Sequence, residues 1–123
     1  MYILTQLEGQ DMISKDLVAA SSKPLILSIL AHGESYGYEI IQQVRELSDG
    51  QMRWKDGMLY PVLHRMKEQG LIESEWRESD SGRKRKYYRL KPQGNEALKA
   101  EKRQWMLVNG ALMRLWEPKP CLT

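Results

Sequence analysis

The spacing of apolar residues changes twice along this 123-residue chain: a helical repeat before residue 70 gives way to alternation over residues 71–90 and returns after Pro92. Residues 71–77 alternate between apolar and charged side chains, which predicts a β-strand. Residues 78–82 have the composition of a loop, and residues 85–90 alternate again. The sequence therefore predicts a single β-hairpin set among helices.

Four helices are expected ahead of the hairpin, each marked by apolar residues three or four positions apart. We expect them at residues 11–20, 24–33, 36–47 and 56–69. Lys23 and Pro24 should separate the first two, because proline disfavours helical backbone at the residue before it. Ser35 is the expected N-cap of the third helix and Asp56 that of the fourth, since either side chain can accept a hydrogen bond from a free backbone N–H. Residues 51–55 between them are expected to be a polar connector.

A long helix is predicted from Pro92 to about Trp116. Its apolar side chains keep the spacing of a coiled-coil seam, and a helix this apolar needs a partner in water. A second copy of the chain is the simplest partner. The residues expected at this dimer interface are Leu98, Trp105, Val108, Leu112, Leu115 and Trp116.

Charge is unevenly distributed along the chain, although the net charge is only +3. The first 50 residues hold three basic and seven acidic side chains, whereas the remaining residues hold sixteen and nine. Six of the nine residues in 83–91 are Lys or Arg, with two tyrosines among them and no acidic residue. Such a run indicates polyanion binding or, on charge alone, a solvated surface strand or a disordered tail. Its place in the fold has to decide between these interpretations.

Composition and motifs exclude several classes of protein. No apolar run approaches the roughly 18 residues of a membrane span, and a start without a basic segment favours a cytoplasmic protein. The single cysteine, Cys121, excludes an internal disulfide. The two histidines, His32 and His64, stand in different predicted helices, and no phosphate-binding loop or nucleophile motif occurs. We therefore expect no enzyme activity, no metal and no cofactor.

The order of elements, helices followed by a hairpin with a cationic second strand, is typical of a winged helix-turn-helix domain. The expected fold class is mainly α with a β-hairpin wing. Residues 1–91 would form the DNA-binding domain with its N-terminal helix, and residues 92–123 a dimerisation helix and tail. The cationic run falls on the wing, which favours nucleic-acid binding over a merely solvated strand.

Three segments carry a more specific sequence signature. They are residues 25–30 with SYGYEII at 35–41, GMLYPVLHRM at 57–66 with GLI at 70–72, and GRKRKYYRL at 82–90 ahead of Gly94. In this order and spacing they resemble the PadR family of bacterial transcriptional regulators over nearly the whole chain. The resemblance implies a homodimeric repressor that binds a palindromic operator and dimerises through its C-terminal helix, often together with the N-terminal one. The single C-terminal helix is similar to that of short-tailed members, and Lys84-Arg85 stands where the family often has a proline.

A winged-helix protein of this kind would contact DNA through its fourth helix and its wing. Tyr60, His64 and Lys67 would lie on one helix face along the major groove. Alternatively, the Tyr60 ring packs against the hairpin and only its hydroxyl reaches a phosphate. The wing-tip cations would contact phosphates or a minor groove. The expected DNA-binding residues are Arg53, Lys55, Tyr60, His64, Arg65, Lys67, Arg83, Lys84, Arg85 and Lys86.

Trp105 follows the wing strand at a distance similar to that of the ligand-stacking tryptophan in multidrug-sensing members of the family. With Asn109 one turn on, it would hold a small planar aromatic or cationic ligand at the dimer centre, and binding would release the repressor. A core aromatic is the alternative interpretation of Trp105. The alternative to an operator-binding regulator is a winged helix that contacts an acidic protein partner or RNA.

Overall fold

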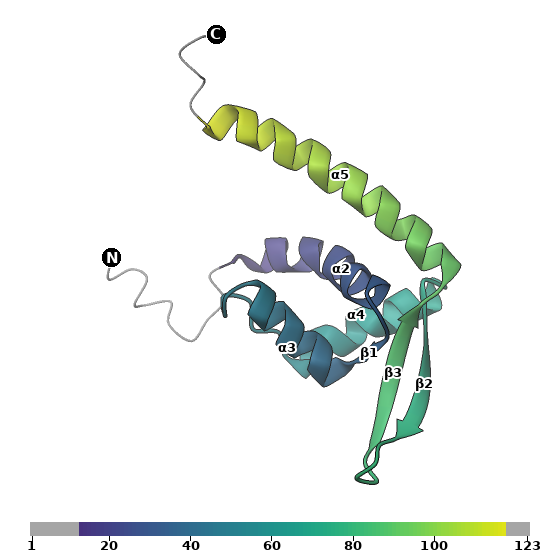
Figure 1. Cartoon of the computed structure of the whole chain (residues 1–123). Helices are drawn as coiled ribbons and strands as arrows, with labels where there is room; N and C mark the ends of the chain where they lie inside the picture. The colour runs from purple at the N-terminus through teal and green to yellow at the C-terminus, as the bar shows by residue number, and fades with distance from the viewer. Residues whose placement is uncertain (1–12, 118–123) are drawn as a thin grey trace.

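Helices make up most of the chain, with one small sheet beside them (Figure 1). The computed structural model describes residues 13–117, so the expected helix start at residue 11 and Cys121 lie outside the described residues. The elements are α2 (Lys15–Ala31), β1 (Ser35–Tyr36), α3 (Gly37–Leu47), α4 (Asp56–Glu68), β2 (Ile72–Glu78), β3 (Lys84–Leu90) and α5 (Pro92–Trp116). The predicted fold class, mainly α with a β-hairpin wing, is confirmed.

α2 runs unbroken through Pro24, so the predicted separation into two helices is wrong. Two hydroxyls bond carbonyl groups ahead of the proline: Ser21 Oγ donates to the Leu17 oxygen at 2.7 Å and Ser22 Oγ to the Ala19 oxygen at 2.9 Å. Four apolar side chains beyond the proline are buried, namely Ile26, Leu27, Ile29 and Leu30. An internal proline costs about 3 kcal/mol, whereas burying one such side chain contributes about 1.5–3 kcal/mol, so burial outweighs the break.

The sheet has three antiparallel strands in the order β1-β3-β2, and β2 and β3 form the predicted hairpin. β1 pairs Ser35 with Tyr88 and Tyr36 with Tyr87. Ser35 therefore lies in a strand and does not cap α3 as expected; Tyr36 occupies the cap position, and Ser35 Oγ donates to Glu39 Oε1 at 2.6 Å. Two residues are too few to show alternation, so the apolar pattern does not reveal this strand.

The segment between α3 and α4 is partly buried, where the sequence predicts a polar connector. Met52 and Trp54 are only 7% and 4% exposed and belong to the core. Lys55 holds the N-cap position expected for Asp56, which lies in the first turn of α4 instead, where a carboxylate still favours the positive end of the helix. Gly70, with a positive φ of 78°, then turns the chain from α4 toward β2.

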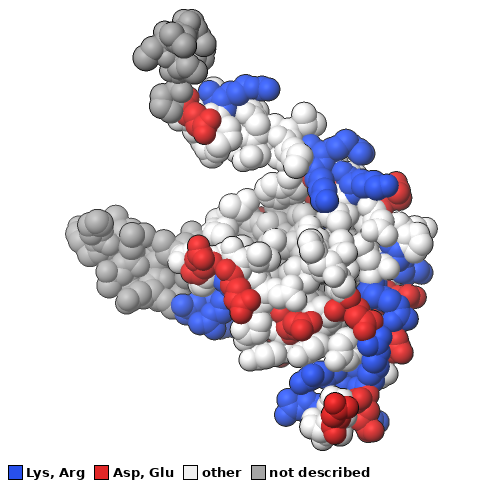
Figure 2. All heavy atoms as spheres, viewed as in Figure 1, with Lys and Arg blue, Asp and Glu red and all other residues white. Residues whose placement is uncertain are grey.

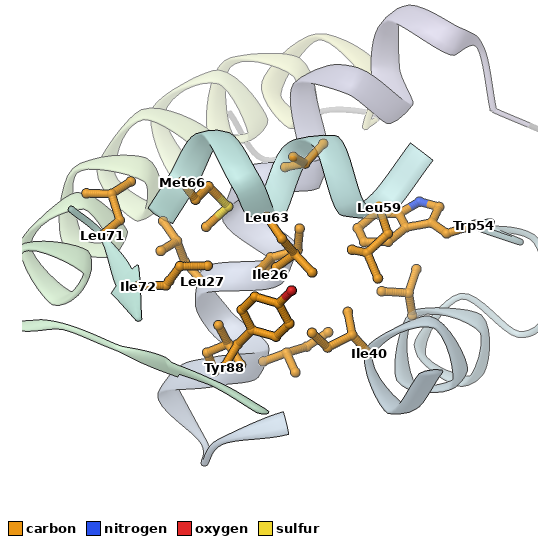
Figure 3. Packing of buried hydrophobic residues seen from close by; sticks show 14 of the residues in the cluster. Ile26, Leu27, Ile40, Trp54, Leu59, Leu63, Met66, Leu71, Ile72 and Tyr88 are labelled. Carbon is orange, nitrogen blue, oxygen red and sulfur yellow. The ribbon is translucent and has the colours of Figure 1, made fainter. Parts of the chain in front are cut away.

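One hydrophobic core fills the space between α2, α3, α4 and the inner face of the sheet (Figure 3). Its most deeply buried apolar residues are Ile26, Leu27, Ile40, Leu59, Leu63, Met66 and Ile72. Figure 3 shows the Tyr88 ring of β3 pointing into this cluster. α4 packs against α2, α3 and β2, and these contacts fix the orientation of its outward face.

α5 follows β3 with only Lys91 between them, passes over α2 and extends beyond the body of the domain (Figure 1). Near its start Gly94 is buried, and an added Cβ there would collide with the Leu71 carbonyl oxygen. Leu98 is 6% exposed and belongs to the core of its own chain, so little of its side chain is left for the dimer interface that the sequence predicts. Helical spacing alone does not distinguish the turns of α5 that lie on the domain from those that leave it.

Candidate nucleic-acid interface

α4 buries one face and presents the other to solvent. Its buried residues are Leu59, Val62, Leu63 and Met66. Tyr60, His64 and Lys67 are exposed on the opposite side, as the helical repeat predicts. This one-sided exposure is what a helix needs in order to enter a groove of DNA.

Tyr60 packs against the first residue of α3. Its hydroxyl lies over Gly37, where an added Cβ would collide with it. Partial burial, together with the nearby Asp56 carboxylate, raises the pKa of the Tyr60 hydroxyl. The hydroxyl is therefore neutral near pH 7 and can donate a hydrogen bond to a phosphate oxygen. This contact with α3 is additional to the hairpin packing of the alternative interpretation. Burial and then the neighbouring Tyr60 raise the pKa of Tyr88 in β3, so Tyr60 also lies near the hairpin.

The front face of the wing, defined here as the face that carries Lys84, Lys86 and Tyr88, looks toward α4. Trp76 of β2 lies directly across from Lys86, whose Nζ is 5.8 Å from the Trp76 ring centroid. Burial and then the neighbouring Lys67 ammonium lower the pKa of Lys86. Lys67 of α4 and Lys86 of β3 thus bring two positive charges together, and an anion between them would relieve their repulsion.

The back face of the wing carries a network of ion pairs. Arg89 Nε and Nη1 lie 2.8 and 2.9 Å from Glu73 Oε2 and Glu75 Oε1, and Arg77 forms a two-pronged hydrogen bond to Glu34. Hydrogen bonds from Arg77 hold the pKa of Glu34 below its usual range, and those from Arg89 and Arg77 do the same for Glu75. These carboxylates neutralise the two arginines, so the remaining positive charge of the wing lies on its front face, at its tip and on Arg85, which shares the back face.

Arg85 is held at the edge of the wing by an aromatic pair. Its guanidinium carbon lies 4.4 Å from the Tyr36 ring centroid. Tyr36 and Tyr87 pack edge to face, with 5.3 Å between their centroids. Stacking positions the Arg85 guanidinium without neutralising it, because the ring carries no net charge. Arg83 and Lys84 stand beside it at the tip, both exposed.

Between the wing and the starts of α3 and α4 lies a groove of about 710 Å³, here called the wing groove. It is lined by Tyr36, Tyr38, Tyr60, Trp76, Arg83, Lys84, Arg85, Lys86 and Tyr88. Figure 2 shows Lys and Arg side chains gathered along the wing. The structure therefore brings Tyr60 together with the four predicted wing cations. Sequence reasoning missed Tyr38 and Trp76; alternation puts Trp76 on the core side of its strand, and only the reach of the wing beyond the core exposes it.

Three predicted contacts on α4, namely His64, Arg65 and Lys67, lie outside the lining of the wing groove. His64 is exposed and its Nε2 lies 3.4 Å from Glu68 Oε2, one turn further along the helix. Arg65 lines a separate groove between α4 and the start of α2. His64 and Lys67 share a helix face with Tyr60, whereas Arg65 does not.

The two predicted contacts ahead of α4 lie at its N-terminal end. Arg53 Nε donates to the Gly50 carbonyl oxygen at 3.1 Å. Lys55 is exposed at the N-cap. Neither is among the residues that line the wing groove.

Comparison with known proteins decides the family. Residues 26–100 match the family model described as the transcriptional regulator PadR-like family. The chain belongs to this family. A transcriptional regulator from Clostridium thermocellum has a TM-score of 0.77 and 31% sequence identity, covering 86% of this chain and 100% of that one. A PadR family transcription regulator from Clostridium difficile has a TM-score of 0.69 and 34% identity, covering 79% and 99%. The transcriptional regulator Rv3488 of Mycobacterium tuberculosis is 42% identical over 78 residues, which are 63% of this chain and 69% of that protein.

As a PadR-like protein the chain is a transcription regulator and not an enzyme. Its winged-helix fold agrees with that of the PadR structures it resembles. Within residues 13–117, no helix has both the length and the apolar character that crossing a membrane requires.

Trp105 of this PadR-like regulator lies in an apolar groove of about 340 Å³ between α2 and α5. Leu17, Pro24, Leu25 and Met52 are among the residues that line it. The indole is 36% exposed, and its Nε1 donates to Glu101 Oε1 at 3.2 Å. Trp105 thus faces α2 of its own chain. Asn109, its predicted neighbour in a ligand site, is exposed one turn further along α5.

Proposed function

We propose that this PadR-like regulator is a homodimeric repressor that binds a palindromic operator, with α4 in the major groove and the wing against the adjoining backbone and minor groove. The observation that carries the proposal is the wing groove, where Tyr60 of α4 converges with Lys84 and Lys86 of the wing. A helix and a wing that face the same side match the two points at which this architecture contacts a duplex.

The contacts divide by chemistry. Lys67 and Lys86 are neighbouring point charges on two elements, so they suit a phosphate bound between α4 and the wing. Tyr60 and His64 carry hydrogen-bonding groups on the exposed face of α4, where base edges of the major groove come within reach. Arg83, at the exposed tip, suits a phosphate or the minor groove. Affinity would come mainly from the lysines and sequence preference from α4.

The dimer rests on the exposed apolar side chains of α5. Those that are more than half exposed are Met106, Leu107, Val108, Leu115 and Trp116. Val108, Leu115 and Trp116 fall on one side of this helix, which leaves its own domain, and such an apolar side suits a second copy of the same helix. Two copies related by a two-fold axis would present two α4 helices to half-sites about 34 Å apart.

Binding to DNA from upstream of the protein's own gene tests the proposal. We expect a gel shift with a duplex that holds both half-sites, and affinity at least about tenfold weaker when one half-site is scrambled at constant salt. A promoter fused to a reporter should be silenced when the chain is expressed. Affinity that ignores the palindrome, or tighter binding to RNA or to an acidic protein, would contradict operator binding; activation of the reporter would contradict repression.

A ligand-controlled release is a second proposal, favoured by the position of Trp105 in an apolar groove beside α5. A planar aromatic or cationic ligand stacked on the indole would change how α5 packs on α2, and thereby the separation of the two α4 helices. Titration with planar dyes should quench Trp fluorescence and release the duplex. Equal quenching and release in the Trp105→Leu variant would contradict a ligand site at Trp105.

A further inference from the structure

The wing carries a large aromatic side chain that the core does not use. Trp76 is 65% exposed, although it lies on the same face of β2 as the buried Ile72. β2 is an edge strand, so the indole stands at the outer margin of the sheet. Exposed tryptophan is unfavourable in water, and no stability role follows from a side chain that is two-thirds accessible.

Trp76 lies beside cationic side chains that could bind an anion. The indole lines the wing groove and lies 5.8 Å from the Lys86 ammonium, measured to the ring centroid. Lys86 in turn adjoins Lys67 of α4. An anion held by these two lysines would bring whatever is attached to it against the indole.

The back face of the same wing is more nearly neutral. Arg89 pairs with Glu73 and Glu75 and Arg77 with Glu34, whereas Arg85, the third arginine of this face, is stacked on the Tyr36 ring. A polyanion is therefore attracted to the front face, and Trp76 is the large aromatic side chain that β2 contributes there.

We infer that Trp76 determines part of the sequence preference of this regulator by packing its indole against the sugar and base edges of the minor groove beside the phosphate held by Lys67 and Lys86. The inference rests on the proposed binding of duplex DNA. A flat apolar ring can approach an A·T pair closely, whereas the 2-amino group of guanine projects into the minor groove and blocks that approach. The wing would therefore prefer A·T pairs where it meets the operator flank.

The first test replaces Trp76 in the full chain. We expect Trp76→Ala to weaken operator binding about tenfold and Trp76→Phe to recover most of it, because aromatic contacts with nucleic acid contribute on this scale. The slope of log K against log salt should stay unchanged, since the indole displaces no counterions. Leu47→Ala, which truncates a 69% exposed side chain on α3 outside the wing groove, is the matched control and should bind as the wild type does.

The second test varies the DNA. Operators whose flanks carry A·T, G·C or inosine·C pairs present the same backbone, and inosine lacks only the 2-amino group of guanine. We expect the wild type to bind the A·T and inosine flanks about five- to tenfold more tightly than the G·C flank, and Trp76→Ala to bind all three within about twofold. Binding of Trp76→Ala at wild-type affinity, or a flank preference that survives in this variant, would overturn the inference. Failure of the wild type to bind any duplex would instead overturn the proposed function, so the two failures are distinguishable.

Discussion

The absence of a side chain at Gly37 determines where Tyr60 can lie. Gly37 is the first residue of α3 and is fully enclosed, with the Tyr60 hydroxyl in the space that a Cβ would occupy. The contact joins α3 to α4 and positions the Tyr60 ring in the lining of the wing groove. Gly37, which would not itself contact DNA, thus positions the Tyr60 side chain, which would.

Gly37→Ala should lower the free energy of unfolding by about 1–3 kcal/mol, because overpacking forces the Tyr60 ring or the backbone to move. Denaturant unfolding measures this change. Gly57→Ala is the matched control: it lies in the first turn of α4 with open space around it, and alanine is favoured over glycine in a helix by up to about 1 kcal/mol. Equal effects of the two substitutions would show that the contact with Tyr60 has no energetic role.

At the scale of elements, the wing has two unlike faces. The front face holds lysines, Trp76 and Tyr88, and the back face holds two arginines bonded to Glu34, Glu73 and Glu75, with Arg85 stacked on Tyr36. Glu34 lies between α2 and β1, so the network ties the loop after α2 to the hairpin. The ion pairs are exposed, and exposed pairs contribute little individually, so their main effect is on the position of the wing and on where its charge is free.

The network predicts a loss of wing stability in acid. Arg77 and Arg89 lower the pKa values of Glu34 and Glu75 below their ordinary 4.5. When folding lowers the pKa of a carboxyl group, ionisation of that group stabilises the folded state. This stabilisation is complete above the pKa of the unfolded state and is lost as the pH falls through the lower pKa of the folded state. Glu75→Gln should therefore melt below the wild type at pH 7 and approach it near pH 3, as followed by thermal unfolding.

A control separates this network from the general effect of acid. Glu46→Gln removes an exposed carboxylate on α3 that makes no ion pair within residues 13–117. It should melt as the wild type does at both pH values. A deficit of Glu75→Gln that persists unchanged at pH 3 would mean that its cause is not the ion pairs.

Periodicity in the sequence predicts those elements whose boundaries depend on local patterns. The hairpin, the buried stripe of α4 and the limits of α5 follow from alternation, helical spacing and Pro92. The helical position of Pro24 and the burial of Trp54 cannot be predicted in this way. Burial of the residues after Pro24 outweighs the local break in α2, and Trp54 is buried by the tertiary structure although its sequence neighbours are polar.

The candidate site divides in the same way. The cationic run and Tyr60 can be assigned from sequence, since their spacing places them on a wing and a helix face. The pairing of Arg89 with Glu73 depends on strand register, and the exposure of Trp76 depends on how far the hairpin extends past the core. Neither quantity is encoded in a local pattern.

For the whole molecule, α5 is the element that connects one domain to another. The predicted interface residues Val108, Leu115 and Trp116 are exposed, whereas Trp105 partly covers α2. We expect Leu115→Glu to convert the proposed dimer into monomers, because a buried unpaired carboxylate is strongly unfavourable in an apolar interface. Sedimentation velocity measures the change.

Arg103→Glu is the matched control for that substitution, since it also adds a carboxylate to an exposed position on α5 but lies on the side of the helix away from Val108 and Trp116. It should leave the oligomeric state as it is. A dimer that persists in Leu115→Glu and dissociates in Arg103→Glu would mean that the opposite side of α5 forms the interface.

The distribution of charge over the whole molecule predicts the salt dependence of binding. Replacing Lys84 and Lys86 by alanine removes four cations from a dimer, so the slope of log K against log salt should become shallower by about 3–4. Lys99→Ala with Lys102→Ala removes as much charge from α5, away from the wing groove, and should leave the slope nearly unchanged. Equal flattening by both pairs would indicate that charge acts over the whole molecule and not through phosphate contacts at the wing.

The direct join between β3 and α5 has a mechanical consequence. Lys91 alone separates them, and Gly94 packs closely against Leu71 and Leu90, which holds the start of α5 in place. α5 has 25 residues and is therefore a lever about 37 Å long. Pivoting such a lever by about 5° displaces its far end by about 3 Å, roughly the rise of one base pair. A rigid helix of this kind would convert a small tilt at its junction with β3 into a displacement of about one base pair at its far end, without unfolding any intervening segment.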